Sequence, residues 1–268
     1  MTVYDFIYEY FRSGLAGFVH SYQKARALKN ADGIVCISEN TKKDLLKFYP
    51  LVDEKKVRVI HCGVGDNFAP CPKDTLNDGV LQKWLETKYV LYVGGRSGYK
   101  NFITALQALS QLPDCALLIA GGGALSDEEK KMLSDKLRNR YHHVSTVDDR
   151  TLNILYSNAF CLLYPSSYEG FGIPLVEAMK CGCPVVTTNT SSIPEVVGDA
   201  GLMVDRIGKD SFVQKLKKLE DIAFRTDIIE RGYRQARRFS WDKCYQETLA
   251  FYEQTIKAKA GSTATTNK

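Results

Sequence analysis

The sequence predicts an α/β fold in which a parallel β-sheet is covered by helices on both faces. Short apolar runs rich in β-branched residues alternate with amphipathic helical stretches, as in folds built from strand–helix–strand units. The runs are continuously apolar, which strands buried on both faces require. An irregular stretch at residues 62–75, with two glycines and two prolines, divides the alternation into two blocks. We therefore expect two Rossmann-like units.

Local signals set the boundaries of the elements. Ser38 is a capping residue before a helix that Pro50 stops. Strands are expected at residues 2–7, 33–37, 56–61, 88–94, 115–120, 143–147, 159–164, 184–188 and 200–204. Helices are expected at residues 12–30, 38–48, 101–112, 126–140, 150–158 and 173–181, with a short turn at 193–197 and more helix to about residue 258.

Composition excludes several classes of protein. With 268 residues and 44% hydrophobic content the chain can bury a large core. The eight cysteines form no CxxC pair, so they indicate a reducing compartment rather than a disulfide framework, and the histidines show no metal-binding spacing. The lysine-rich helices lack interleaved aromatics, which argues against nucleic acid. No apolar stretch approaches the roughly 20 residues of a membrane span, and we see no signal peptide.

The most informative segment is residues 168–179, with the sequence YEGFGIPLVEAM. It follows an apolar strand and precedes a helix, where open α/β sheets bind ligands. Gly170 and Gly172 permit a close approach of the backbone to a ligand, and Pro174 suits the first helical position. Because a helix N-terminus attracts anions, a diphosphate is the expected occupant. The amides expected to point out of this helix end are those of Ile173, Leu175 and Val176.

Two glutamates, Glu169 and Glu177, flank this anion site. Carboxylates repel phosphate, but they accept hydrogen bonds from hydroxyl groups. The pair therefore suggests a ligand with two polyol parts around a diphosphate, which are the sugar and the ribose of a nucleotide sugar.

The spacing of Glu169 and Glu177 within EGFGIPLVEAM resembles the signature of the family 4 retaining glycosyltransferases, which have the GT-B fold. The resemblance covers residues 2 to about 250. Further segments resemble the same family: residues 37–42, 59–64, 91–96 with 100–101, 164–166, 180–186, 192–196 and 199–201.

The resemblance implies a complete C-terminal Rossmann-like donor domain at residues 71–250 and a partial N-terminal, acceptor-side domain at residues 1–70. Residues 251–268 are expected to be a helix end and a frayed tail. The first residues of the chain resemble a strand late in the family's N-terminal domain, so about half of that domain is expected to be absent. Tyr4 stands where many relatives have a histidine.

The resemblance also implies residue roles. Glu177 would bind the ribose hydroxyls and Glu169 the donor sugar, while Arg96 and Lys100 would hold the diphosphate and stabilise the charge that develops as it leaves. No carboxylate is evident as a nucleophile, and no D-x-D motif is present, so no metal or cofactor is expected besides the donor. The remaining donor-binding positions would be Gly170, Phe171, Gly172, Leu175 and Val176, with Val144 and Val147 beside the base.

The expected function is transfer of a hexose from a GDP- or UDP-sugar to a glycan or lipid-linked acceptor. Mannose is the first choice, because residues 95–102 resemble mannosyltransferases of surface-polysaccharide assembly. A truncated, non-catalytic binding module that needs a partner chain is one alternative, and an epimerase or phosphorylase of the same fold is another. The expected location is the cytoplasm, with the inner membrane surface as a further contact. The aromatic run at residues 4–11 would touch that membrane or an acceptor, or would be core that the absent half no longer covers.

Overall fold

The computed structural model describes residues 1–73 and 78–265, and both of its sheets are parallel. The chain divides into two compact units. The first unit contains Met1–Gly63, Glu169–Phe171 and the segment from Phe239 through the last helix; the second contains Val64–Tyr168 and Gly172–Arg238. The division after Gly63 lies in the irregular stretch predicted at residues 62–75, whose last two residues are outside the described part of the chain.

The first unit is a three-stranded parallel sheet of order β1-β2-β3, in which Thr2 pairs with Val35 and Ile34 with Val57. Its strands are β1 (Thr2–Val3), β2 (Ile34–Cys36) and β3 (Val57–Val59). Its helices are α1 (Ile7–Phe11), α2 (Leu15–Asn30), α3 (Glu39–Phe48), η1 (Glu54–Lys56) and α12 (Trp241–Thr265).

The long helix α12 packs on this small sheet through Phe251, which joins Val35 and Ile60 in a buried cluster. The sequence interpretation placed residues up to 250 in the other domain and assigned residues 251–268 to a helix end and a frayed tail. The helix continues to Thr265, and residues 266–268 lie outside the described residues.

The second unit is a six-stranded parallel sheet of order β6-β5-β4-β7-β8-β9. Its strands are β4 (Tyr89–Val93), β5 (Ala116–Ala120), β6 (Tyr141–Val144), β7 (Cys161–Tyr164), β8 (Val185–Thr188) and β9 (Gly201–Val204). Its helices are α4 (Gly79–Leu85), η3 (Gly98–Lys100), α5 (Phe102–Leu109), α6 (Asp127–Leu137), α7 (Asp149–Asn158), α8 (Ile173–Lys180), α9 (Ile193–Val197), η4 (Gly198–Ala200), α10 (Lys209–Lys218) and α11 (Ile222–Ala236).

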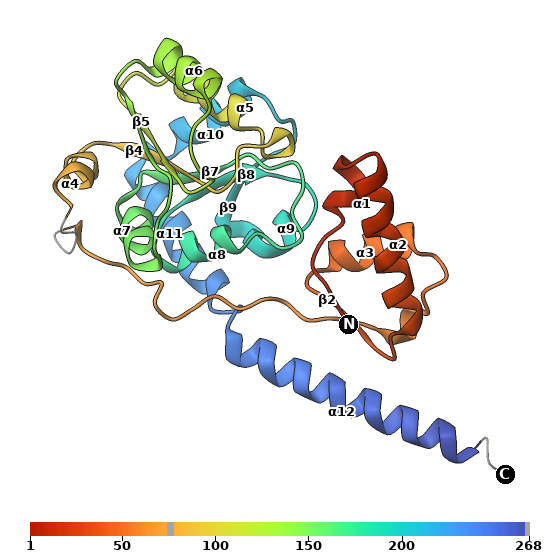
Figure 1. Ribbon diagram of the computed structural model, residues 1–268. Coiled ribbons are helices and arrows are strands. Elements are labelled where there is room, and N and C mark those ends of the chain that lie inside the picture. Colours follow the sequence, from red (N-terminus) through yellow and green to blue (C-terminus); the bar gives the residue numbers. More distant parts are fainter. Residues whose placement is uncertain (74–77, 266–268) are drawn as a thin grey trace. The chain divides into compact units, whose positions relative to one another are not determined.

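Helices cover both faces of this sheet, as the continuous apolar strands predicted. Helices α5, α6 and α10 lie on one face and α7, α8, α9 and α11 on the other (Figure 1). The core is made of fully buried strand and helix side chains such as Val90, Leu117, Ile119, Leu163, Val186 and Phe212.

Three local predictions were wrong. The strand expected at residues 2–7 ends at Val3, because the Asp5 carboxylate accepts the Ile7 amide at 2.9 Å and starts α1 there. Helix α4 was missed because it is only 7 residues long and begins with a glycine; Asp78 caps it. The strand expected at residues 143–147 occupies Tyr141–Val144 instead. The predicted Ser38 cap is confirmed, since its side chain accepts the Thr41 amide at 3.0 Å.

Candidate functional site

The strand order of the second unit reverses between β4 and β7. The chain passes from β4 outward to β5 and β6, and then returns to the opposite side of β4 with β7, β8 and β9. All six strands are parallel, so the loops that leave β4 and β7 lie at the same edge of the sheet. Open α/β sheets bind ligands at such a switch point.

Lys100 lies at this switch point. It ends η3 in the loop after β4, and its Nζ is 3.4 Å from the hydroxyl of Tyr164, the last residue of β7. The side-chain amide of Asn101 donates to the Pro165 carbonyl at 3.0 Å, and the Ser167 amide donates to the Tyr99 carbonyl at 2.8 Å. These hydrogen bonds hold the two loops together, so a predicted diphosphate residue is brought beside the segment that carries the glutamate motif.

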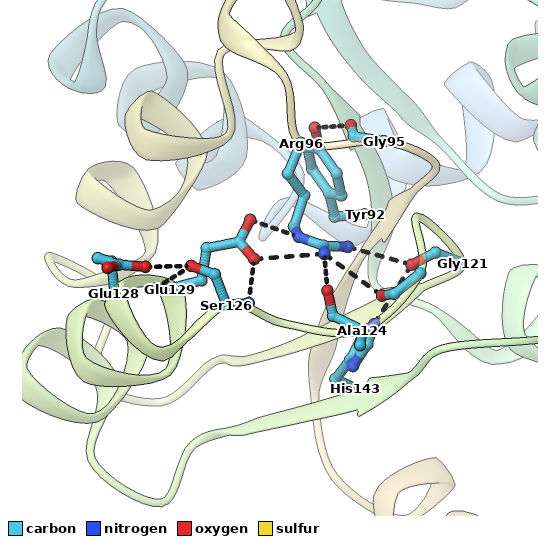
Figure 2. A network of polar contacts seen from close by, with 10 residues as sticks. Tyr92, Gly95, Arg96, Gly121, Ala124, Ser126, Glu128, Glu129 and His143 are labelled. Carbon is cyan, nitrogen blue, oxygen red and sulfur yellow. Dashed lines mark hydrogen bonds and ion pairs between the residues drawn. The ribbon is translucent and has the colours of Figure 1, made fainter.

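Arg96, the other predicted diphosphate residue, forms hydrogen bonds with the loop that follows β5, the strand on the other side of β4 from β7. Figure 2 shows its guanidinium surrounded by the loop between β5 and α6. Its Nε donates to Glu129 Oε1 at 2.7 Å, Nη1 to the Gly121 carbonyl at 3.2 Å and Nη2 to the Ala124 carbonyl at 2.9 Å. The side chain is only 5% exposed. The predicted contact between Arg96 and a diphosphate therefore stays a prediction, and it would require these bonds to be exchanged.

Glu129 is held in place by its own helix. Its carboxylate accepts the Ser126 amide at 2.8 Å, while the Ser126 hydroxyl accepts the Glu129 amide, which is a complete capping box. Burial alone would raise the pKa of Glu129, but the hydrogen bonds from Arg96 and from the Ser126 amide, with the charge of Arg96, lower it below its usual value. Glu129 is therefore an ionised partner of Arg96 near neutral pH.

Helix α8 begins at the expected place, with one change in its first turn. Gly172 precedes it with φ of 98°, a left-handed conformation that favours glycine. Pro174 is its second residue, not its first. The Leu175 amide, expected to be open to a ligand, donates to the Gly172 carbonyl at 3.0 Å. That part of the anion-site prediction is therefore wrong, and the side chains of Leu175 and Val176 are fully buried in the core.

Glu177 is half-buried on α8 beside a residue that the sequence did not reveal. The hydroxyl of Tyr156, a fully buried residue of α7, donates to Glu177 Oε2 at 3.0 Å. Desolvation by burial raises the pKa of Glu177 to about 7, opposed by the Tyr156 hydrogen bond and assisted by the negative charge of Asp149. Glu177 thus has a neutral hydrogen-bond donor where Glu129 has a cation. No local pattern could have indicated Tyr156, because helix–helix contact decides its partner.

The residues Glu169–Phe171 belong to the first unit by their contacts. Glu169 is only 8% exposed. The Gly170 carbonyl accepts the Thr41 hydroxyl at 3.1 Å, and a Cβ at Gly170 would lie 1.9 Å from the Tyr4 carbonyl. The Phe171 ring lies 5.4 Å from that of Phe239. Glycine at 170 is therefore required by packing against backbone, which differs from the approach of a ligand that the sequence suggested.

Val144 and Val147 are half-buried at the β6 end of the sheet. The Val144 carbonyl accepts the Gly121 amide at 2.8 Å. Because β5 separates β6 from β4, the strand that carries Val144 lies about 10 Å from β4, which is two strand spacings. A nucleotide with its diphosphate at the switch point can span that distance, and the base contact remains a prediction.

Within the described ranges, no group of three or more His, Cys, Asp or Glu side chains is placed to hold a metal ion. No helix of the described residues is long and apolar enough to cross a membrane.

Comparison with known families agrees with this geometry. Residues 75–235 match the family described as glycosyl transferases group 1, and residues 2–68 match glycosyltransferase family 4. This chain belongs to the group 1 glycosyltransferases. The group 1 match includes the whole six-stranded sheet.

Among curated relatives, the chain is 32% identical over 237 residues to O-antigen chain mannosyltransferase B of Escherichia coli, covering 85% of this chain and 62% of that protein. It is 26% identical to the O-antigen chain mannosyltransferase RfbU of Salmonella typhimurium, covering 82% of this chain and 59% of that protein. The chain therefore spans about 60% of the length of these relatives.

Solved structures confirm the predicted GT-B fold. Sucrose-phosphate synthase from Thermosynechococcus elongatus superposes with a TM-score of 0.78 at 23% identity, covering 96% of this chain and 67% of that one. HepE of Anabaena, solved in complex with UDP-glucose, superposes with a TM-score of 0.77 at 17% identity, covering 97% of this chain and 71% of that one.

Proposed function

We propose that this chain carries the donor site of a retaining glycosyltransferase, which transfers a hexose from a nucleotide sugar to a glycan or lipid-linked acceptor. The observation that carries the proposal is the contact at the β4–β7 switch point between Lys100, in the loop after β4, and Tyr164, at the end of the strand that precedes α8 and Glu177. The family of the chain supports the reaction class. The O-antigen mannosyltransferases among its relatives favour mannose, with GDP-mannose as the first donor to try and UDP-sugars next.

The proposed donor lies with its diphosphate near Lys100 and the amino end of α8, and with its ribose at Glu177. A lysine there stabilises the negative charge that develops on the departing nucleoside diphosphate. Glu177 is proposed to accept hydrogen bonds from the ribose hydroxyls. Both of its oxygens are acceptors only when the carboxylate is ionised, so the ionised form is the one that binds best. Glu169 is proposed to accept hydroxyls of the donor sugar. No metal is expected at the proposed donor site, so we expect a chelator such as EDTA to leave donor binding unchanged.

A thermal-shift screen of sugar nucleotides tests the donor site. A ligand present at about 100 times its dissociation constant adds about 2.7 kcal/mol to the free energy of unfolding. We expect at least one GDP- or UDP-sugar to raise the melting temperature, and Glu177→Ala to abolish that rise. A rise that is unchanged in Glu177→Ala would place the nucleotide elsewhere.

A donor-binding module without transfer activity is the second candidate, because the chain spans about 60% of its relatives' length. Product analysis with GDP-mannose separates the two functions. Release of GDP with formation of a mannoside supports the transferase, whereas donor binding without release, over hours, supports the module.

A further inference from the structure

The irregular stretch that follows β3 is folded into the second unit without forming a helix or a strand. Residues 64–71 belong to that unit and have no regular secondary structure. Val64 and Phe68 within them are nevertheless buried, with exposed fractions of 3% and 5%. Backbone groups beside buried side chains need hydrogen-bond partners, which here must come from neighbouring elements. We call residues 64–71 the strap.

Side chains of α7 supply partners for the second half of the strap. The Ala69 amide donates to Asn153 Oδ1 at 2.9 Å. The Cys71 amide donates to the Ser157 hydroxyl at 3.1 Å, and the Cys71 carbonyl accepts the side-chain amide of Asn158 at 3.2 Å. These hydrogen bonds fix the strap along α7.

The first half of the strap is held by α8 and by the first residue of α7. Lys180 Nζ donates to the Gly65 carbonyl at 2.9 Å and forms an ion pair with Asp66 at 3.0 Å. The side-chain amide of Asn67 donates to Asp149 Oδ2 at 3.2 Å. The strap is therefore bonded to both helices that form the proposed ribose site.

Phe68 connects the strap to the proposed ribose site. Its ring centroid lies 6.2 Å from that of Tyr156 at an interplanar angle of 66°, which is an edge-on aromatic contact. The Tyr156 hydroxyl donates to Glu177 Oε2 at 3.0 Å. Because a hydrogen bond weakens steeply as its angle departs from linear, a small rotation of the Tyr156 ring would weaken this bond. Close packing by Phe68 opposes that rotation.

Two side chains of α7 act on Glu177 in opposite directions. The Tyr156 hydrogen bond lowers the pKa of Glu177, whereas the charge of Asp149 adds to the effect of burial and raises it. Further charged or titratable side chains of α8 and of the helices that pack against it include Arg150, Lys180, Cys181, Glu195, Glu230 and Tyr233. None of these is altered in the variants compared below.

We propose that Phe68 is a positioning residue of the donor site: by packing against Tyr156, it directs the tyrosine hydroxyl onto the Glu177 carboxylate that is proposed to bind the ribose. This inference rests on the proposed function for the identity of the ligand. The contacts from Phe68 through Tyr156 to Glu177 involve no ligand, so they can also be tested in the unliganded chain.

The titration of Glu177 without ligand tests the positioning role. It is followed by ¹³C NMR of the glutamate carboxyl carbons, and the signal of Glu177 is the one that Glu177→Gln removes. The parent chain should have a midpoint at about pH 7. Tyr156→Phe should raise the midpoint by about 0.7 pH units, the equivalent of one neutral hydrogen bond, and Phe68→Leu by about half as much. The double variant should titrate as Tyr156→Phe does, because no hydroxyl remains to be positioned.

Phe102→Leu is the matched control. Phe102 is 2% exposed, and its ring lies edge-on to that of Tyr92 at 5.0 Å, so the same substitution removes a similar aromatic contact at α5. It should leave the Glu177 midpoint where it is in the parent chain. Phe68→Met, in which the side chain has nearly the same volume as leucine, replaces Phe68→Leu if that variant does not fold.

Three results would overturn the proposal: an unchanged or lowered midpoint in Phe68→Leu, a further rise when Phe68→Leu is added to Tyr156→Phe, or an equal rise in Phe102→Leu. The second result would mean that Phe68 acts on Glu177 through burial, and the third that any loss of aromatic packing in the second unit has the same effect.

Calorimetry with the sugar nucleotide that the thermal-shift screen selects relates these contacts to the donor site. Phe68→Leu should weaken binding about twofold at pH 7, where a smaller fraction of Glu177 is ionised, and should have little effect at pH 9, where Glu177 is ionised in both proteins. Equal affinity at pH 7 despite a raised midpoint would overturn the proposal. A parent chain that binds no sugar nucleotide but titrates as expected contradicts the proposed function and leaves the action of Phe68 on Glu177 standing.

Discussion

Glu129 and Glu177 are both half-buried carboxylates of the second unit, and their surroundings shift their pKa values in opposite directions. Glu129 faces the Arg96 guanidinium, which outweighs burial and lowers its pKa. Glu177 faces a tyrosine hydroxyl, and burial raises its pKa to about 7. A buried carboxylate with a built-in cation is satisfied by the fold. The Glu177 carboxylate has a tyrosine hydroxyl as its hydrogen-bond donor and, within the described residues, no cation bonded to it. Its oxygens can therefore accept further hydrogen bonds from the hydroxyl groups of a ligand.

The largest expected effect is the pH dependence of donor binding. If only ionised Glu177 binds the ribose, a pKa of about 7 makes the affinity for GDP-mannose fall roughly 30-fold between pH 8 and pH 5.5. The diphosphate of a sugar nucleotide carries no terminal phosphate group that titrates in this range, so the slope reports the protein. Calorimetric titration across this range measures it.

Two variants control this measurement. Glu177→Gln should bind weakly at every pH, with a flat profile. Glu129→Gln should keep the slope of the parent chain, since Glu129 titrates below its ordinary value. An identical slope in the parent chain and Glu177→Gln would assign the titration to another group.

The free energy of unfolding of the unliganded chain should also distinguish Glu177 from Glu129, with a smaller effect than that on donor binding. Folded Glu177 binds its proton more tightly than unfolded glutamate, so the free energy of unfolding falls as the pH rises from about 4.5 to about 7. Glu177→Gln removes this cost and should raise the free energy of unfolding at pH 8 by on the order of 1–2 kcal/mol, with little change at pH 4.5.

Glu129→Gln should do the opposite, lowering the free energy of unfolding at pH 8 by about 1–3 kcal/mol, because it leaves Arg96 without its counterion. Urea denaturation of both variants at the two pH values checks the signs. A change of the same sign in the free energy of unfolding at pH 8 for both variants would contradict the distinction between the two carboxylates.

The smallest effect is expected from Tyr156→Phe. The Tyr156 hydrogen bond stabilises the ionised form of Glu177 and opposes the effect of burial. Removing the hydroxyl should therefore move the midpoint of the pH profile for donor binding to higher pH and weaken binding a few-fold at pH 7, by roughly one hydrogen bond. A midpoint that moves to lower pH would mean that the hydroxyl does not favour the carboxylate.

The sequence predicted helices and strands better than it predicted which side chains contact one another. Continuous apolar runs located all nine strands of the described residues, with errors mainly at residues 4–7 and 145–147, because burial on both faces leaves a strong pattern. The start of α8 followed from Gly172 and Pro174. In each case the signal lies within a few residues of the feature.

Side-chain partners were harder, because the order of the strands sets them and local patterns do not. The pairing of Arg96 with Glu129 spans 33 residues and depends on β5 lying beside β4. Tyr156 reaches Glu177 across two helices. The Ser126–Glu129 capping box is a local contact, but it indicates only where α6 begins and does not indicate the arginine partner.

The central claim is that Glu177 binds the ribose of a nucleotide. A cycle that compares the parent chain and Glu177→Gln, each with GDP and with 2′,3′-dideoxy-GDP at pH 8, tests it most directly. The account predicts that the parent chain prefers the ribose form by at least about tenfold, the worth of hydrogen bonds to a charged group, and that Glu177→Gln loses this preference. Equal preference in the two proteins would contradict the claim.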